Sequence, residues 1–420
     1  MKTTMKNVIS GLILAFAVIS VCQSKNNLAR LRETRSLYPY LRIRNWGTFA
    51  DGASDRLRAL AWHPTEQCFA IAGGPRSTLA QLRLYSVVGD STGARMEPVT
   101  SVDVESSGHD TSYQANALAW NAAGTYLGVG SNGTATKQFR VYSYANNTLT
   151  ESISVNWNTT TAGVVNTVSW HPGGKYVAIG GTGQASSYQV IVYAVDAITP
   201  QLTAVVGLKL GTSSTVYSVA WDATGNYLAV GCGQESTGKA ALQMYQFTDG
   251  GLFGSYALTQ KSTYDFGGSS AYVKDVAWSP NGTYLAVGGY VGTGTYELML
   301  FKAQSGALAM VSGSEVDFGA PNEFGYGTVF VNTLAWDPEG TYLLVGGRGQ
   351  TSQQQAIMYQ LENDTLTPRR GSQIKFGTAD ATSVAALAWQ PSRQFVLIGG
   401  YSASNSKELW LAEFLTAKPS

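Results

Sequence analysis

A short apolar phrase that ends in tryptophan occurs seven times along the 420-residue chain, and this repetition restricts the fold more than any other feature. Successive tryptophans are 50 to 58 residues apart. A period of this length indicates a repeat architecture in which each unit covers the apolar faces of its neighbours. The phrases are LRALAW, ANALAW, VNTVSW, VYSVAW, VKDVAW, VNTLAW and VAALAW, ending at Trp62, Trp120, Trp170, Trp221, Trp278, Trp336 and Trp389.

Other residue types recur at constant distances after each tryptophan. The second position is proline in five copies, the sixth is aromatic in six, and the tenth is glycine in six. A further aromatic residue follows 21 to 24 residues after the tryptophan in all seven copies. These shared positions indicate one structural unit repeated seven times.

Each unit predicts four strands. The tryptophan phrase is short, apolar and bounded by turn residues, which is typical of a strand buried on both faces. Asp337-Pro338-Glu339-Gly340 is typical of a type I turn, because Asp favours the first position, proline sets φ at the second and glycine favours the fourth. A returning strand (TYLLVGG), a third strand (AIMYQL) and a more variable fourth strand (GSQIKFG) follow.

A single four-stranded sheet cannot cover its own two faces, whereas sheets stacked radially in a closed ring cover one another. The sequence therefore predicts an all-β fold, a seven-bladed β-propeller of four-stranded antiparallel blades over residues 41–415, with a short tail at 416–420. The seventh unit lacks a fourth strand, because the chain ends soon after residues 409–414. We expect an N-terminal strand, residues 41–49, to complete this C-terminal blade and close the ring.

These repeats resemble divergent WD40 repeats in the strand–turn–strand phrase and in the aromatic residue that ends the third strand. The resemblance implies a propeller that serves as a protein-interaction scaffold. The chain departs from the family pattern, since Tyr85-Ser86 stands in one copy where the family has Trp-Asp, and the Gly-His pair occurs once, at Gly108-His109. We therefore do not expect the hydrogen-bonded tetrad of the family, and aromatic and aliphatic packing should hold the blades together.

The N-terminal segment has the composition of a targeting sequence. Lys2 and Lys6 precede an uncharged apolar run, residues 8–21, that is shorter than the roughly 18 residues a spanning helix needs. Residues 1–24 are therefore predicted to be a signal peptide, followed by a basic linker over residues 25–40. We expect an exported protein of bacterial type that is periplasmic, on the cell surface or secreted, with no membrane span in the mature chain.

Cys22 offers a second way for the signal peptide to end. Ile19-Ser20-Val21-Cys22 resembles the lipoprotein box of bacteria, in which the cysteine is lipidated after cleavage, although that box has a small residue where this chain has Val21. Cleavage after Ser24, a small residue, is the more ordinary alternative. A lipid anchor at Cys22 and a free mature chain both remain open.

Composition and motifs exclude several function classes. The formal net charge is +1 and 13% of the residues are charged, which argues against a nucleic-acid binder. The three histidines lie in different repeats or loops, so no two are spaced to share a metal ion. No G-x-S-x-G elbow follows a strand. We therefore expect no catalytic residues, no metal and no cofactor, in a chain that is monomeric.

One face of the propeller should carry the loops that lead into each blade and those between second and third strands. These loops are rich in Gly, Ser, Thr, Gln and Asn with interspersed aromatic residues, and tyrosine gives contact area at low entropic cost. We expect a protein partner on this loop-rich face; a glycan or cell-wall binder and a lactonase-like hydrolase are the alternatives. The candidate binding residues are Tyr113, Tyr217, Tyr272, Tyr290, Phe324, Tyr326, Arg348 and Tyr401.

Overall fold

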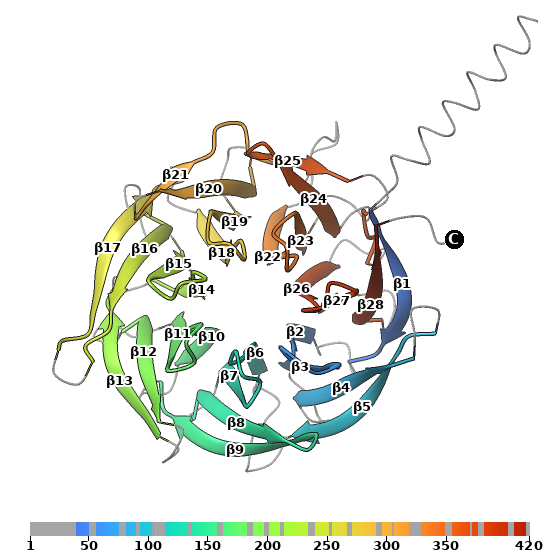
Figure 1. Ribbon diagram of the computed structural model, residues 1–420, viewed down its shortest axis with the longest axis horizontal. Helices are drawn as coiled ribbons and strands as arrows, with labels where there is room; N and C mark the ends of the chain where they lie inside the picture. Colours follow the sequence, from blue (N-terminus) through green and yellow to red (C-terminus); the bar gives the residue numbers. More distant parts are fainter. Residues whose placement is uncertain are drawn as a thin grey trace, which may run out of the picture.

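Seven four-stranded antiparallel blades surround a central channel, and the chain visits them in order around the ring (Figure 1). This arrangement confirms the predicted seven-bladed β-propeller. The computed structural model describes residues 39–49, 56–74, 81–89, 93–102, 104, 114–132, 137–157, 163–182, 188–196, 201–210, 214–233, 240–251, 254–266, 271–290, 296–304, 306–318, 329–348, 355–369, 372–376, 382–401 and 407–416. The predicted signal peptide with Cys22, the linker up to residue 38 and the tail from residue 417 lie outside these ranges.

The first four blades follow one another from the innermost strand outwards. Blade one consists of β2 (Arg56–Trp62), β3 (Cys68–Gly74), β4 (Leu82–Val88) and β5 (Arg95–Val102). Blade two consists of β6 (Gln114–Trp120), β7 (Tyr126–Asn132), β8 (Phe139–Ala145) and β9 (Thr148–Val155). Blade three consists of β10 (Val164–Trp170), β11 (Tyr176–Thr182), β12 (Val190–Asp196) and β13 (Gln201–Leu208). Blade four consists of β14 (Val216–Trp221), β15 (Tyr227–Cys232), β16 (Leu242–Thr248) and β17 (Ala257–Tyr264).

The last three blades continue the ring. Blade five consists of β18 (Tyr272–Trp278), β19 (Tyr284–Tyr290), β20 (Leu298–Gln304) and β21 (Ala307–Met310). Blade six consists of β22 (Phe330–Trp336), β23 (Tyr342–Arg348), β24 (Ala356–Glu362) and β25 (Thr365–Pro368). Blade seven consists of β26 (Ser383–Trp389), β27 (Phe395–Tyr401) and β28 (Leu409–Leu415), completed by β1 (Tyr40–Gly47).

The N-terminal strand β1 closes the ring by pairing antiparallel with β28, as predicted, so blade seven has the order β1-β28-β27-β26. The Arg44 guanidinium donates from Nε and one terminal nitrogen to Glu413 Oε2, at 2.8 and 2.5 Å. Both side chains are largely buried, at 15% and 5% exposed. The first and last strands of the fold therefore share one sheet and a shielded ion pair.

The repeated tryptophans join each blade to the blade before it. In six blades the indole N–H donates to the carbonyl of the residue that precedes the tryptophan of the previous blade, as Trp336 Nε1 does to Ala277 O at 3.0 Å. Trp221 Nε1 is buried and makes no such bond among the described residues. The tryptophans thus combine core packing with a hydrogen bond between neighbouring blades.

The second strand of each blade is the most buried, and a glycine there allows the next blade to come close. At Gly288 in β19, an added Cβ would lie 2.4 Å from Val331 Cγ1 of blade six. No side-chain carbon tolerates this separation, so glycine at the tenth position after the tryptophan is needed for blade packing. This accounts for its recurrence in the sequence.

Tight turns between the first and second strands occupy the face opposite the loop-rich one. The predicted turn at Asp337 forms: Gly340 N–H donates to Asp337 O at 2.9 Å, and Gly340 has a φ of 69°. In blade seven the corresponding residue is Arg393, which adopts a φ of 66° and donates in the same way to Gln390 O at 2.8 Å. Arg393 Nε also lies 2.7 Å from the buried Asp337 Oδ2 of blade six.

No helix that is long and apolar enough to cross a membrane occurs within the described ranges.

Candidate functional site

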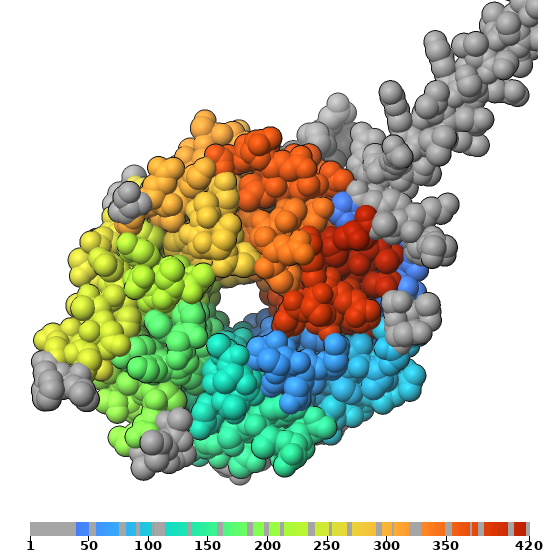
Figure 2. Space-filling view, viewed as in Figure 1, coloured from blue at the N-terminus to red at the C-terminus, as the bar shows by residue number. Residues whose placement is uncertain are grey.

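A cavity of about 470 Å³ opens where the innermost strands begin, at the loop-rich end of the central channel. Figure 2 shows the channel as a hole through the middle of the ring. The position four residues before each repeated tryptophan supplies one side chain per blade to this cavity. These seven residues are Arg58, Asn116, Asn166, Tyr217, Lys274, Asn332 and Ala385. We call them, with the lining residues Arg56, Tyr272, Phe330, Ser383 and Tyr401, the channel mouth.

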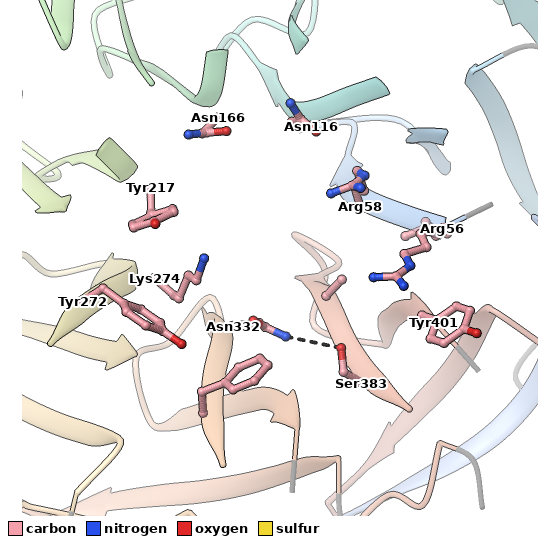
Figure 3. Close-up of a pocket in the computed structure, with 13 residues that line it drawn as sticks. Arg56, Arg58, Asn116, Asn166, Tyr217, Tyr272, Lys274, Asn332, Ser383 and Tyr401 are labelled. Carbon is pink, nitrogen blue, oxygen red and sulfur yellow. Dashed lines mark hydrogen bonds between the residues drawn. The ribbon is translucent and has the colours of Figure 1, made fainter. Parts of the chain in front are cut away.

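The channel mouth is cationic. Arg56 and Arg58 of β2 reach into the cavity from one side and Lys274 of β18 from the other (Figure 3). No Asp or Glu belongs to the described residues that line the cavity. The local field therefore favours an anion, because no carboxylate of the lining neutralises these three charges.

Burial leaves Arg58 and Lys274 poorly solvated. It lowers the pKa of Lys274 from its ordinary value. Burial also lowers the pKa of Arg58, with a further contribution from the neighbouring positive charge of Arg56. Arg58 Nε is buried and has no hydrogen-bond partner among the described residues. A buried donor without a partner is costly, so an acceptor placed here would be bound favourably.

Tyrosines surround Lys274 on its side of the channel mouth. The Lys274 ammonium lies 3.7 Å from the ring centroid of Tyr217 and 5.1 Å from that of Tyr272, which is cation–π geometry. Tyr272 stacks in turn on Tyr290, with centroids 5.3 Å apart. Burial raises the pKa of both Tyr217 and Tyr272, so their hydroxyls stay neutral. On the opposite side, the Arg56 guanidinium lies 4.6 Å from the Tyr401 ring.

Amide side chains tie the lining of the channel mouth to neighbouring blades. Asn166 Nδ2 donates to Val216 O at 3.0 Å, and Asn332 Nδ2 donates to Val384 O at the same distance. Each bond connects an innermost strand to that of the next blade. The amides are therefore held in place before any ligand arrives, which lowers the entropic cost of binding.

Below the channel mouth, Asp275 of β18 lines an adjoining pocket of about 220 Å³. Asp275 Oδ1 accepts hydrogen bonds from Ser218 Oγ at 2.8 Å and from Val276 N at 2.9 Å, while Oδ2 accepts from Leu334 N at 2.7 Å. Burial outweighs these bonds and raises the pKa of Asp275 to about 6. The carboxylate is thus engaged between blades and does not compete for the cations above it.

The structure brings part of the predicted binding set together. Tyr217, Tyr272 and Tyr401 line the channel mouth, and Tyr290 packs against Tyr272. Arg348 ends β23 opposite Phe330, another lining residue. Tyr113, Phe324 and Tyr326 lie outside the described residues. That this set binds a partner stays a prediction.

Sequence reasoning missed the cations Arg56, Arg58 and Lys274. A signal for two of them was present, since Arg58 and Lys274 share the position four residues before a repeated tryptophan. In a propeller this position alternates with the buried ones and faces the channel. Comparing the residues at this position in the seven phrases would have shown two basic residues and no acidic one.

A second group of polar side chains has the composition of a metal site. His63, Glu66 and Cys68 each offer one ligand atom, and these three atoms lie within 4.8 Å of one another. However, His63 Nδ1 accepts hydrogen bonds from the N–H groups of Thr65 and Glu66, and Nε2 lies 2.9 Å from Gly124 O. Burial raises the pKa of the Cys68 thiol to about 11, which disfavours the thiolate that binds metals. The group is better explained as the hydrogen-bonded turn that joins blades one and two.

Comparison with known proteins supports the fold. Residues 206–237 and 260–290 match the family model "WD domain, G-beta repeat". They run from the outer strand of one blade into the second strand of the next. No curated protein matches the chain. Among solved structures, 1402 chains match this chain, so the structural similarity shows the fold and singles out no activity.

One of these structures is titled "Crystal Structure of Mitotic Checkpoint Complex". The chain in it is 18% identical, with a TM-score of 0.55, and the match covers 91% of this chain and 93% of that one. An identity this low shows similarity of fold alone. Together with the matched repeats, it shows that this chain contains WD40-type repeats and folds as a propeller of that kind.

Proposed function

We propose that this protein is a non-catalytic scaffold that binds a protein partner at the channel mouth on its loop-rich face. The tyrosine group of Tyr217, Tyr272 and Tyr290 beside Lys274 is the single observation that carries the proposal. Tyrosine and arginine, which both line the channel mouth, are enriched where proteins bind one another, because they combine apolar area with directional polar contacts.

The fold supports the same proposal. Propellers with WD40 repeats commonly act as interaction scaffolds, and a rigid ring presents its loops without needing to rearrange. None of the described lining residues is a histidine, a cysteine or a carboxylate, so they form neither a Ser–His pair nor the paired carboxylates of many hydrolases. We also propose that binding takes place outside the cytoplasm, in line with the composition of residues 1–24.

Photocrosslinking tests the proposal. A benzoylphenylalanine placed at Tyr272 should crosslink a specific protein in the source cell, identified by mass spectrometry, because this side chain faces the cavity. The same group at Ala123, exposed in a tight turn on the opposite face, is the matched control. Crosslinking at both positions or at neither would overturn the proposal.

A glycan array with the purified propeller addresses the main alternative. Sugar binding that is lost on Tyr272→Ala, together with no protein crosslink, would assign the channel mouth to a glycan. Crosslinking that Tyr217→Ala weakens, without sugar binding, supports the protein partner.

A further inference from the structure

We propose that the channel mouth is a binding site for a ligand that carries two or more carboxylate groups, held between the arginine pair of blade one and Lys274 of blade five. The ligand is either a free polycarboxylate or an acidic segment of a protein. In the first case the site is independent of the scaffold function proposed above. In the second it rests on that function and names the chemistry of the partner.

The placement of the charges requires more than one anionic group. Arg56 and Arg58 lie on β2, whereas Lys274 lies on β18, three blades away in one direction and four in the other. In Figure 3 their charged ends point into the cavity from opposite walls. One carboxylate at either wall leaves the other wall unneutralised, so a ligand with separated carboxylates matches the site better than a single anion.

The cost of assembling this site points to a ligand as well. Burial lowers the pKa of Arg58, and the neighbouring positive charge of Arg56 lowers it further. The buried Arg58 Nε has no partner in the described protein. In the same cavity, the amides of Asn166 and Asn332 already donate to backbone carbonyls of neighbouring blades. Arg58 Nε is therefore a donor of the lining that a ligand can satisfy.

Side-chain donors of this kind suit carboxylate groups. Phosphate sites usually present backbone N–H groups at a helix N-terminus or a turn nest. The residues that line this cavity belong to strands and not to a helix N-terminus, and the side chains of Arg56, Arg58 and Lys274 supply cationic donors to it. A guanidinium binds a carboxylate with two parallel hydrogen bonds, and the cavity of about 470 Å³ has the size of a small-ligand pocket.

Two probes test the site on the full chain. The first is a fluorescein-labelled octapeptide of alternating Glu and Ser, measured by fluorescence anisotropy, with its Gln-Ser counterpart as the neutral control. The second is citrate, measured by calorimetry. We expect at least one acidic probe to bind, with an affinity that falls with added salt. If the peptide is the ligand, the Gln-Ser peptide should bind at least tenfold more weakly than the Glu-Ser peptide.

Variants locate the binding. Lys274→Gln and Arg56→Gln should each weaken binding about tenfold, because a hydrogen bond to a charged group contributes at least that factor. Lys274→Arg should restore most of it. The matched control is Lys261→Gln, which removes an exposed charge on the outer strand β17 and should change nothing. Arg56 is exposed, so its variant should fold even if a change at buried Arg58 does not.

Each outcome decides the question. Citrate binding assigns a free polycarboxylate, and peptide binding alone assigns an acidic segment. No binding of either probe at millimolar concentration, or equal binding by Lys274→Gln, would overturn the proposal. Should this happen while Tyr272 still crosslinks its partner, the scaffold function stands and only the carboxylate assignment fails.

Discussion

Asp275 of blade five accepts a hydrogen bond from the backbone N–H of Leu334 in blade six, with 2.7 Å between the two atoms. Hydroxyl groups make the corresponding bond elsewhere in the ring. Thr167 Oγ accepts from Val219 N at 3.1 Å, and Ser218 Oγ accepts from Val276 N at 3.2 Å. The same connection between neighbouring blades is thus made by neutral side chains twice and by a buried carboxyl group once.

The raised pKa of Asp275 makes stability depend on pH. Its folded pKa is about 6, against an ordinary 3.8, so the folded state binds the proton more tightly than the unfolded state does. The contribution of Asp275 is therefore most favourable below about pH 4 and is lost as the pH rises to about 6. A difference of this size corresponds to about 2–3 kcal/mol.

Asp275→Asn tests this relationship, because it removes the titrating group. The unfolding free energy of the original protein, minus that of the variant, should fall by about 2 kcal/mol between pH 4 and pH 6.5. Urea denaturation across this pH range measures it. A difference that stays constant with pH would show that Asp275 does not titrate as described.

The ion pair of Arg44 with Glu413 should contribute strongly to ring closure. Arg44→Ala leaves the buried Glu413 carboxylate unpaired, and we expect a loss of about 2–4 kcal/mol in unfolding free energy. Arg95→Ala is the control, since Arg95 and its partner Glu97 are 60% and 46% exposed and should cost at most about 0.5 kcal/mol. Equal losses in chemical denaturation would contradict a special role for the pair.

Truncation tests the closing strand as a whole. Removing residues 1–47 deletes β1 and exposes an edge of β28, so a large fall in melting temperature is expected. Removing residues 1–36 leaves β1 in place and should have little effect. Similar melting temperatures for the two truncated proteins would show that β1 does not close the ring.

Arg393 occupies a turn position where five of the other six blades have glycine. Arg393→Ala should cost about 2–4 kcal/mol, because it keeps the left-handed backbone and leaves the buried Asp337 carboxylate without its cation. Arg393→Gly should be about 1 kcal/mol less damaging, because glycine adopts a φ of 66° without strain. Thermal and urea unfolding of both variants measures the difference. A glycine variant that is less stable than the alanine variant would contradict this account.

The tryptophan hydrogen bonds can be isolated by comparing two blades. Trp336→Phe loses the bond from Nε1 to Ala277 O, whereas Trp221→Phe loses an indole N–H that has no partner among the described residues. Both variants remove similar apolar area. We therefore expect Trp336→Phe to be more destabilising by about 1 kcal/mol in urea denaturation, and equal effects would assign the tryptophans to packing alone.

The fold was predictable because its determinants are local and repeated. The spacing of the tryptophan phrases and the turn residues that follow them specify one blade, and a seventh unit with three strands indicates that another segment supplies its fourth. The predicted closing strand over residues 41–49 differs from β1 by one residue at its start and two at its end. The residue pattern of one repeat was therefore sufficient to predict the closed ring.

The candidate site was less predictable because it exists only across blades. Arg58 and Lys274 are separated by 216 residues, and they line the same cavity because the blades form a ring. The aromatic residues indicated the correct end of the channel. Which side chains lie beside them depends on how the strands pair, and the sequence does not show this. Likewise the hydrogen bond from Trp62 to Ala388 joins the first blade to the last, and no local pattern predicts which tryptophan lacks this bond.

The pairing of β1 with β28 has a consequence for biosynthesis. β1 leaves the ribosome before every other strand of the propeller, yet its partner is the last to be made. Until β28 has been made, β1, which carries Ile43 and Trp46, must wait without its neighbour, while six blades can already have assembled beside it. The ring therefore cannot close before β28 has left the ribosome, and a chain truncated before β28 would present an unsatisfied strand at each end.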